Sequence, residues 1–306
     1  MRVILAGATG TIASELVPRL RAAGHTVLGL TRDPARLRVP DVRPVVADVM
    51  DGDGLLAALD GVTADAVIHE ATAITRTPTR HRDLYATDEL REVGTRNLLR
   101  AAELVGATRF LTQSLFLGYG WGDHGPVTLT EEAPFAELTG GPFDRHLRAL
   151  RSNEDQVRGA GGIALRYGLF YGPEPSTFRM MAMARKRMLP VPRPSATMHL
   201  IHIADAASAT VAALERGGAG EAYNVVDDEP VDMADYIDAV AAAAGARRPL
   251  RIPGWFLHAT PYLHSLLSGT RIRLSNDKAR RELGWAPAYP GYRQGLATLT
   301  STSPTN

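Results

Sequence analysis

Residues 2–13 read RVILAGATGTIA and join a short apolar run to a glycine turn and a helix start. The apolar run has the composition of a buried strand, and an amphipathic helical pattern begins at Ser14. Gly7 permits a sharp turn, and Gly10 lets the backbone approach a pyrophosphate, which the free N–H groups of a helix start attract. This strand–turn–helix context predicts a dinucleotide-binding turn rather than an ordinary βα connection. The predicted cofactor contacts in the turn are Gly7, Thr9, Gly10, Thr11 and Ile12.

The composition excludes several classes of protein. The chain has 306 residues, of which 45% are hydrophobic, enough for a substantial core and one or two domains. Its net charge of +1 offers no electrostatic case for binding nucleic acid or an anionic membrane. The absence of cysteine excludes disulfides and thiolate chemistry and fits a reducing compartment, so we expect a cytoplasmic protein. No signal peptide is recognisable, and no run reaches the roughly 18 apolar residues of a membrane span.

Strand and helix patterns alternate through the first two-thirds of the chain, which predicts an α/β fold with a doubly wound parallel sheet. Strands are expected at residues 2–6, 25–30, 42–47, 66–69, 109–113, 163–167, 200–203 and 223–226. Helices are expected from residue 14 and at 54–59, 88–105, 146–158, 178–188, 204–216, 232–244 and 275–283. The methionine-rich segment 178–188 favours core packing, or the wall of an apolar pocket.

These elements divide the chain into two parts. Residues 1–171 are expected to form a dinucleotide-binding Rossmann domain, to which residues 199–226 return. Residues 172–198 and 227–298 are expected to form a smaller, C-terminal substrate-binding lobe, and 299–306 a frayed tail. The substrate would then bind between the two parts, a usual place for a pocket.

The order of motifs along nearly the whole chain resembles the extended short-chain dehydrogenase/reductase family, also called the NAD-dependent epimerase/dehydratase family. Besides the glycine turn, the motifs are ADVMD (47–51), VIHEATA (67–73), GTRNLL (94–99), RYGLFYGP (166–173), IHIADAA (201–207), YNV (223–225) and KARRELGW (278–285). The resemblance implies a Rossmann sheet of about seven strands. It also implies a homodimer built on the helices 88–105 and 146–158.

The resemblance extends the set of expected cofactor contacts. The family's Asp after the third strand contacts the adenine, and the loop after the fourth strand lies beside the cofactor. The family's loop under the nicotinamide corresponds to residues 166–173. Together these imply contacts from Asp48, Val49, Ala71, Thr72, Ala73, Gln113, Tyr167, Phe170 and Tyr171.

The chain departs from the family where the chemistry occurs. The family uses a Tyr, a Lys four residues later and a Glu four further on. Alignment on Glu154 places His146 at the Tyr position and Leu150 at the Lys position. The only lysines are Lys186 and Lys278, and neither has a Tyr four residues before it, so the chain contains no Tyr-x-x-x-Lys pair.

Two further positions differ from the family pattern. Arg91 stands three residues before the glycine of the helix motif, where the family often has Asn. At the end of the fifth strand the family's Ser/Thr pattern reads Gln113-Ser114-Leu115. If Gly120 sets the register, Leu115 falls on the catalytic Ser/Thr position and Ser114 one residue before it.

Ser114 and His146 are the candidate catalytic residues. Ser114 follows a parallel strand at its C-terminal end, where ligands bind in such sheets, so its hydroxyl is either a substrate contact or a cofactor-lining or capping group. His146 has an unperturbed pKa near 6.5, which suits a general acid or base, although it also fits an exposed histidine at a helix start. His199 and His202 lack a third ligand at metal-like spacing, so we expect no metal site.

Arg32 follows the second strand, where an acidic residue would hydrogen-bond the ribose 2′-OH of NAD. An arginine there suits the 2′-phosphate of NADP, whereas its alternative is a solvated loop arginine. The sequence therefore predicts NADP as the cofactor.

The leading functional hypothesis is an NADP-dependent oxidoreductase acting on a small, largely apolar carbonyl or alcohol compound. Ser114, with His146 or a bound water, would stabilise and protonate the substrate oxygen. The alternatives are a non-redox isomerase, dehydratase or cyclase that keeps the nucleotide site, and a nucleotide-sensing binding protein. The expected partners are a small-molecule substrate and a second copy of the chain, without nucleic acid or membrane.

Overall fold

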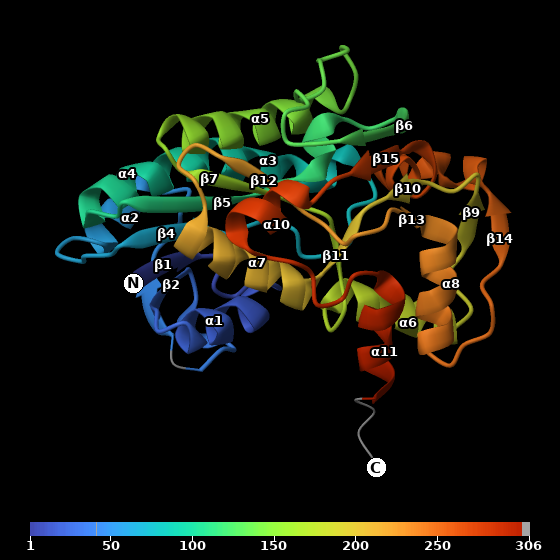
Figure 1. The fold of residues 1–306 in the computed structure, drawn as a ribbon, viewed down its shortest axis with the longest axis horizontal. Coiled ribbons are helices and arrows are strands. Elements are labelled where there is room, and N and C mark those ends of the chain that lie inside the picture. Colours follow the sequence, from blue (N-terminus) through green and yellow to red (C-terminus); the bar gives the residue numbers. More distant parts are fainter. Residues whose placement is uncertain (41, 302–306) are drawn as a thin grey trace.

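A computed structural model describes residues 1–40 and 42–301, and its centre is a seven-stranded sheet (Figure 1). The strand order is β12-β7-β5-β4-β1-β2-β3, and every pairing in it is parallel. The strands are β1 (Arg2–Ala6), β2 (Thr26–Thr31), β3 (Arg43–Val46), β4 (Ala66–His69), β5 (Arg109–Leu115), β7 (Ile163–Tyr167) and β12 (Ala222–Val225). The predicted doubly wound α/β fold is confirmed.

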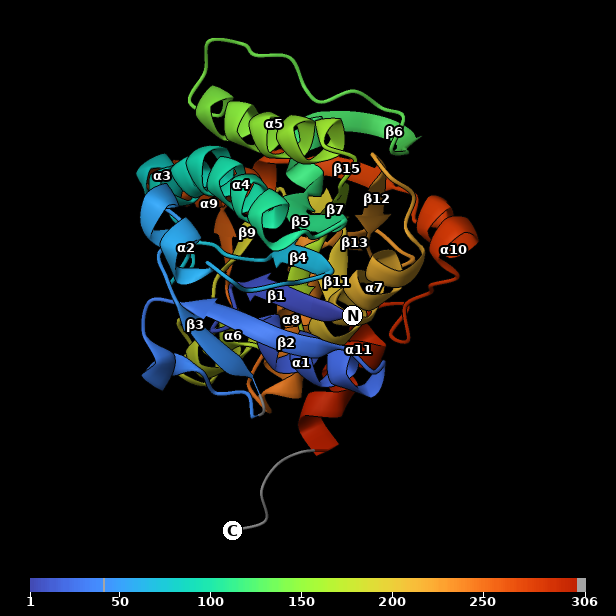
Figure 2. The same ribbon diagram turned by 90° about the vertical axis from the view of Figure 1, so that its left-hand side faces the viewer.

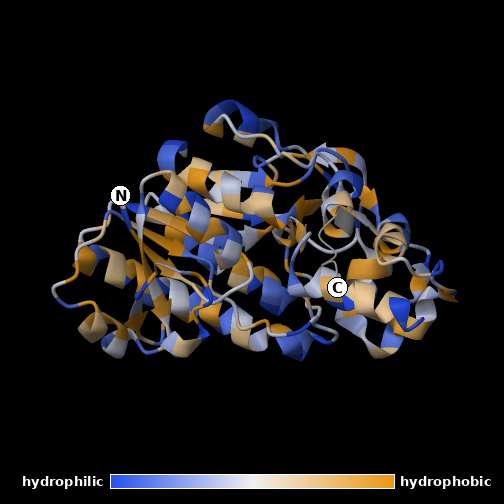
Figure 3. Cartoon of the chain, turned by 90° about the horizontal axis from the view of Figure 1, so that it is seen from below, coloured by the Kyte–Doolittle hydropathy of each residue, from blue (hydrophilic) through white to orange (hydrophobic). Residues whose placement is uncertain are grey.

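Helices cover both faces of this sheet, as Figure 2 shows. One face packs against α1 (Ala13–Ala22) and α7 (Ile203–Arg216), and the other against α2 (Gly52–Ala58), α4 (Thr95–Val105) and α5 (Asp144–Gly159). Each helix turns an apolar stripe to the sheet, such as Leu16, Val17 and Leu20 of α1, which are fully buried. Figure 3 shows the apolar residues gathered along the central strands.

The helix predicted at residues 88–105 begins earlier and is interrupted. It consists of α3 (Tyr85–Glu89), a π-helical turn at Leu90–Gly94, and α4. Single π-helical turns inside α-helices occur often at functional sites.

The exposed positions of α4 and α5 are mainly charged, because the apolar side chains of both helices pack on the sheet. Leu104 is the one large apolar side chain that these helices expose. Neither helix therefore offers a partner a broad apolar face, and the homodimer that the resemblance implies stays a prediction.

The second part of the molecule has its own core and short strands. Its four-stranded sheet has the order β13-β10-β15-β6, and the pairs β8–β11 and β9–β14 lie beside it. Its strands are β6 (Asp123–Leu129), β8 (Leu169–Tyr171), β9 (Val191–Arg193), β10 (Thr197–Met198), β11 (Leu200–His202), β13 (Val231–Asp232), β14 (Arg251–Pro253) and β15 (Arg271–Leu274). The predicted strand at 200–203 thus pairs with β8 and not with the central sheet.

Three longer helices complete this part: α6 (Pro175–Arg185), α8 (Met233–Ala243) and α11 (Tyr292–Ser301), with the single turn α9 (Pro261–His264). The helix α10 (Asp277–Leu283) instead packs through Ala279 and Leu283 beside α7, in the core of the Rossmann part. The frayed tail predicted from Leu299 is corrected in part, because α11 continues to Ser301, and residues 302–306 lie outside the described residues. Within residues 1–40 and 42–301, no helix combines the length and the apolar character needed to cross a membrane.

Candidate active site

A cavity of about 590 Å³ lies between the two parts, at the carboxyl ends of the central strands. The Rossmann side contributes the turn after β1, the loop after β4 and the end of β5. The lobe contributes α6, α8 and the segment around Tyr262. The lining is largely apolar and includes Leu115, Leu150, Phe170, Met180, Met183, Ile237 and Leu266. Two methionines of the predicted Met-rich helix therefore do line an apolar pocket.

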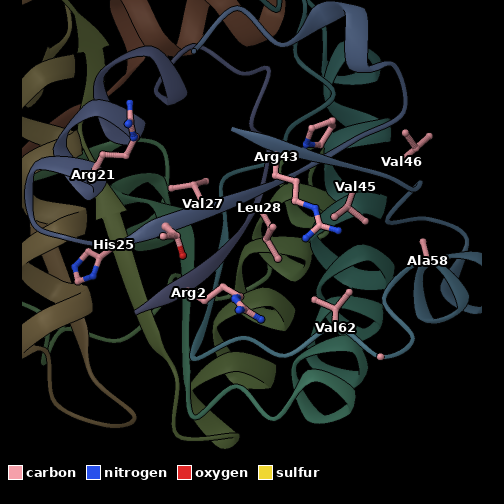
Figure 4. Close-up of a pocket in the computed structure, with 13 residues that line it drawn as sticks. Arg2, Arg21, His25, Val27, Leu28, Arg43, Val45, Val46, Ala58 and Val62 are labelled. Carbon is pink, nitrogen blue, oxygen red and sulfur yellow. The ribbon is translucent and has the colours of Figure 1, made fainter. Parts of the chain in front are cut away.

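A second cavity, of about 720 Å³, lies at the opposite edge of the sheet (Figure 4). It is lined at the amino ends of β1 and β2, with the arginines Arg2, Arg21 and Arg43 around it. Because ligands of open α/β sheets bind at the carboxyl ends of the strands, the cavity between the two parts is the candidate active site.

The glycine turn packs so closely against neighbouring backbone that it leaves no space for side chains at Gly7 and Gly10. Gly7 has a φ of +98°, and a Cβ there would lie 2.6 Å from the carbonyl carbon of Glu70. The Gly10 N–H donates to the Gly7 carbonyl at 2.8 Å, and a Cβ on Gly10 would lie 3.0 Å from that oxygen. Ile12 caps α1 without a side-chain hydrogen bond, while the N–H groups of Ala13 and Glu15 donate to the carbonyls of Gly10 and Ile12 at 3.2 and 3.0 Å. The positive end of the helix dipole still points to this turn and would favour an anion there.

Gly10, Thr11 and Ile12 line the cavity, and Thr9 is exposed at the same turn. These residues fit a dinucleotide pyrophosphate at this helix start.

The ends of β2 and β3 place two predicted cofactor contacts beside one another. Arg32 Nη1 lies 3.8 Å from Asp48 Oδ2, and the Arg32 side chain is 72% exposed. The neighbouring Asp33 uses its carboxylate to accept the Ala35 N–H at 3.0 Å, so it caps a short 3-10 helix. Asp48 accepts the Met50 N–H at 3.0 Å, and Val49 is buried beside it.

The loop after β4 is tied to β5 and α3 by hydrogen bonds. Gln113 Nε2 donates to the Ala71 carbonyl at 3.2 Å, and the Ala73 N–H donates to Thr87 Oγ1 at 3.1 Å. Thr72 and Gln113 line the cavity, as does Phe170 of β8.

Tyr167 and Tyr171 require a correction, because both side chains are fully buried away from the cavity. The Tyr167 hydroxyl donates to Glu70 Oε1 at 2.9 Å and lies 2.6 Å from Thr210 Oγ1 of α7. Tyr171 packs edge-on against His202 in the lobe core. Each ends a strand on the side that faces the protein interior, so neither meets a cofactor.

Glu70, which does line the cavity, is a buried acid. Burial raises its pKa to about 8, partly offset by the hydrogen bond from Tyr167. At neutral pH this carboxyl is therefore mainly uncharged, and it adds little negative charge to the site.

Ser114 also requires a correction. Its hydroxyl is fully buried and donates to Glu154 Oε1 at 2.6 Å, within a network in which Arg166 holds the same carboxylate at 2.8 Å. Because side chains alternate along a strand, Gln113 and Leu115 face the cavity and Ser114 faces α5. Ser114 thus serves a structural network, and Leu115 lines the cavity in its place.

His146 lines the cavity at the start of α5, with Leu150 one turn further along the helix. Its Nδ1 lies 2.7 Å from Asp88 Oδ2, and a carboxylate can only accept, so Nδ1 carries a proton. Its Nε2 lies 3.0 Å from His81 Nδ1, and the two rings are nearly parallel. Both nitrogens of His146 are therefore engaged by the protein.

His81 is only partly buried, so it connects the hydrogen-bonded row of Asp88, His146 and His81 to solvent. Burial lowers its pKa, the neighbouring His146 lowers it further, and Asp88 opposes both. His81 was not predicted from the sequence, because it begins a 3-10 helix of only four residues (His81–Leu84) that carries no recognisable periodicity.

Aromatic rings form one wall around His146. The centroids of Trp121 and Phe143 lie 4.5 Å apart, and the Tyr262 ring lies 5.8 Å from that of His146. Trp121 and Tyr262 line the cavity and were not predicted, because they come from a loop and from the lobe. Such a wall suits a flat, unsaturated substrate.

His199 and His202 have structural partners. His199 Nδ1 lies 3.1 Å from the Asp227 carbonyl, and its Nε2 accepts the Leu274 N–H at 3.0 Å. Within the part of the chain that the structure describes, no three His, Cys, Asp or Glu side chains gather in a way that could hold a metal.

The fold and the site define a Rossmann-type protein with a dinucleotide turn and an apolar substrate cavity. The chain belongs to the NAD dependent epimerase/dehydratase family, whose sequence model matches residues 3–226.

Two curated relatives match almost the whole chain. The chain is 35% identical to a 3-diazoavenalumate denitrifying reductase of Streptomyces sp, over 97% of this chain and 99% of that protein. It is 28% identical to a 3 beta-hydroxysteroid dehydrogenase/Delta 5→4-isomerase of Mycobacterium tuberculosis, over 94% of this chain and 86% of that protein. Relatives of this kind are reductases and dehydrogenases, which supports an oxidoreductase.

Solved structures share the fold. A human epimerase family protein with NADPH superposes with a TM-score of 0.79 at 19% identity, over 99% of this chain and 100% of that chain. A dTDP-glucose 4,6-dehydratase of Streptomyces venezuelae with NAD gives a TM-score of 0.78 at 22% identity, over 98% and 96%.

Proposed function

We propose that this chain is an NADP-dependent reductase of a small, largely apolar substrate with a flat ring. The glycine turn would hold the pyrophosphate, and Arg32 would meet the 2′-phosphate. When bound, the dinucleotide supplies hydride, which the protein orients toward a substrate in the cavity. A cytoplasmic homodimer, predicted from the sequence, stays part of the proposal.

One observation carries the choice of substrate group: the family's proton-donating positions hold no free donor here. Leu115 and Leu150 are aliphatic, and both nitrogens of His146 are bonded to Asp88 and His81. A reaction that needs no proton from the protein fits this arrangement best.

The two reductions differ in their need for a proton. A carbonyl consumes hydride and a proton to become an alcohol. A diazonium-type group consumes hydride alone, because R–N₂⁺ + H⁻ gives R–H + N₂. The Streptomyces relative is named for the reductive removal of nitrogen from a diazo compound, and it matches this chain over its full length. We therefore propose an aryl diazonium group, whose reduction by hydride releases nitrogen without a proton, as the hydride acceptor.

The second candidate for the hydride acceptor is a carbonyl group. The hydrogen bonds that link Asp88 to His146 and His146 to His81 favour it. If the bond between His146 and His81 opens, Nε2 is free to protonate a substrate oxygen, and His81 reconnects the pair to solvent. Asp88 would hold the ring orientation throughout.

The experiment offers the enzyme two matched ring compounds, one with an aldehyde and one with a diazonium group, together with NADPH. Nicotinamide absorbance, nitrogen release and transfer of deuterium from labelled NADPH are followed, with heat-inactivated enzyme as the blank. We expect one nitrogen released per NADPH oxidised, and little effect of His146→Gln on the rate.

Three other outcomes are decisive. Reduction of the aldehyde alone, with turnover lowered about 10²–10⁴-fold in His146→Ala, would establish the carbonyl candidate instead. Conversion of substrate at constant nicotinamide absorbance would establish a non-redox enzyme. Cofactor binding without conversion of any compound tested would favour a nucleotide-sensing protein.

A further inference from the structure

Arg91 is a buried cation that the proposed reaction does not use. Its side chain is 5% exposed, it lies in the π-helical turn between α3 and α4, and it lines the cavity. Its ion-pair partner is Asp88, with 3.7 Å between Arg91 Nη1 and Asp88 Oδ1, a distance too long for a hydrogen bond. No described residue accepts a hydrogen bond from its Nε.

The charge of Arg91 is only partly balanced. The Asp88 carboxylate lies 3.7 Å from Arg91 Nη1 and 3.7 Å from Arg145 Nε, and it also accepts a hydrogen bond from His146. One carboxylate therefore faces two guanidinium groups. Burial lowers the pKa of Arg91, which reflects the cost of keeping this charge away from water. A buried guanidinium with five donors and no hydrogen bond is costly unless a ligand supplies the acceptors.

The other acidic residues that line the cavity do not supply the acceptors that Arg91 lacks. Of its two acids, Glu70 is mainly neutral, and Glu174 accepts the N–H groups of Ser176 and Thr177 as the cap of α6. Two further arginines, Arg76 and Arg179, line the same cavity. The cavity thus combines apolar walls with an excess of positive charge.

The aromatic wall is close to this cation. The charge of Arg91 acts on the Tyr262 hydroxyl, and Trp121 Nε1 is a buried donor without an acceptor among the described residues. A molecule that lays a ring against Trp121 and Tyr262 would bring an attached acidic group toward Arg91.

We propose that Arg91 binds a carboxylate of the substrate, so that the substrate is a ring compound carrying an acid group. This inference rests on the proposed function, since it concerns the same cavity. A planar carboxylate matches the guanidinium fork and can accept two of its N–H groups at once.

The test measures binding without turnover. Kd values of 3-phenylpropanoate and its neutral amide are determined by calorimetry with NADP⁺ present at saturation. We expect the unmutated protein to bind the carboxylate about 10–100-fold more tightly than the amide. Arg91→Met should remove this preference, and Arg91→Lys should restore only part of it, because lysine lacks the fork.

Arg179→Gln is the matched control, because Arg179 lines the same cavity but is exposed on α6. It should change the preference less than about threefold, since exposed charges are screened. If Arg91→Met fails to fold, the comparison of Arg91→Lys with Arg179→Gln still decides whether Arg91 binds the carboxylate.

Equal affinity for the two probes in the unmutated protein would overturn the proposal. So would a loss of NADP⁺ affinity in Arg91→Lys with the carboxylate preference intact, because Arg91 would then serve the cofactor. Since binding is measured without hydride transfer, a protein that prefers the carboxylate but never oxidises NADPH would refute the proposed function and leave this inference standing.

Discussion

Replacement of Arg32 by glutamine should abolish a preference for NADPH over NADH. The structure allows the size of this preference to be worked out from the neighbours of the guanidinium. Arg32 Nη1 lies 3.8 Å from Asp48 Oδ2, and the two side chains are 72% and 40% exposed. An ion pair so exposed contributes about 0–1 kcal/mol, so little is lost when the guanidinium turns to a phosphate.

A charge-assisted hydrogen bond to that phosphate contributes about 1.5–3 kcal/mol. After the competition from Asp48 is subtracted, about 1–2 kcal/mol remains, which is about a 5–30-fold tighter Kd for NADPH. Asp48→Asn removes the competitor and should raise the preference toward the upper end of this range. Calorimetric titration of both cofactors into the three proteins measures each value.

Salt and a control variant make the test sharper. The preference should shrink as ionic strength rises, because the contact is exposed. Arg36→Gln, on the 3-10 helix after β2, removes a nearby exposed charge and should leave the preference within about threefold. Equal affinity for NADPH and NADH in the unmutated protein would refute the reasoning, as would an equal loss of affinity for both in Arg32→Gln.

Three further predictions concern stability and assembly. Glu70 has a pKa of about 8 in the folded protein against 4.5 as a free group, so its stabilising effect is complete below pH about 4.5 and is lost as the pH rises toward 8. Relative to Glu70→Gln, the unmutated protein should lose up to about 1.4 kcal/mol of unfolding free energy per pH unit in urea titrations across this window, and parallel curves would contradict it. Ser114→Ala should cost about 1–3 kcal/mol of stability by leaving the buried carboxylate of Glu154 short of a donor, with kcat unchanged. A tenfold fall in kcat at unchanged Tm would return Ser114 to the chemistry. Light scattering at micromolar concentration should give twice the chain mass of 32.9 kDa, and a monomer mass would exclude the predicted dimer.

The Rossmann half of the fold could be predicted because its elements carry their own periodicity. Strands such as β1, β2 and β4 are mainly apolar runs, and helices such as α7 repeat apolar residues at helical spacing. The strands β6, β10 and β13 could not be predicted, since two of them have only two residues and β6 pairs with β15 more than a hundred residues away. Pairing of this kind is decided by tertiary contacts rather than by local pattern.

Within the site, backbone positions were predictable and side-chain directions were not. The glycine turn depends on local geometry, which the residues 2–13 determine by themselves. The prediction that Ser114 contacts the substrate was wrong, because a residue one position before the catalytic Ser/Thr position points to the other face of the sheet. Asp88 and Arg91 are three residues apart on one helix, a spacing that pairs them, yet nothing in that spacing indicates that His146 of α5 joins them.

The cavity holds a buried cation, as the family's lysine would provide, but the cation comes from a different element of the fold. The family's lysine position on α5 is Leu150, whereas Arg91 approaches from the turn between α3 and α4. Lysine changes pKa readily and can take part in proton transfer, but a guanidinium stays charged in proteins. Arg91 can therefore fix a negative charge and cannot pass a proton. Under the two proposals above, such a cation, together with a His146 held at both nitrogens, would orient a substrate by its carboxylate for hydride transfer rather than protonate a product.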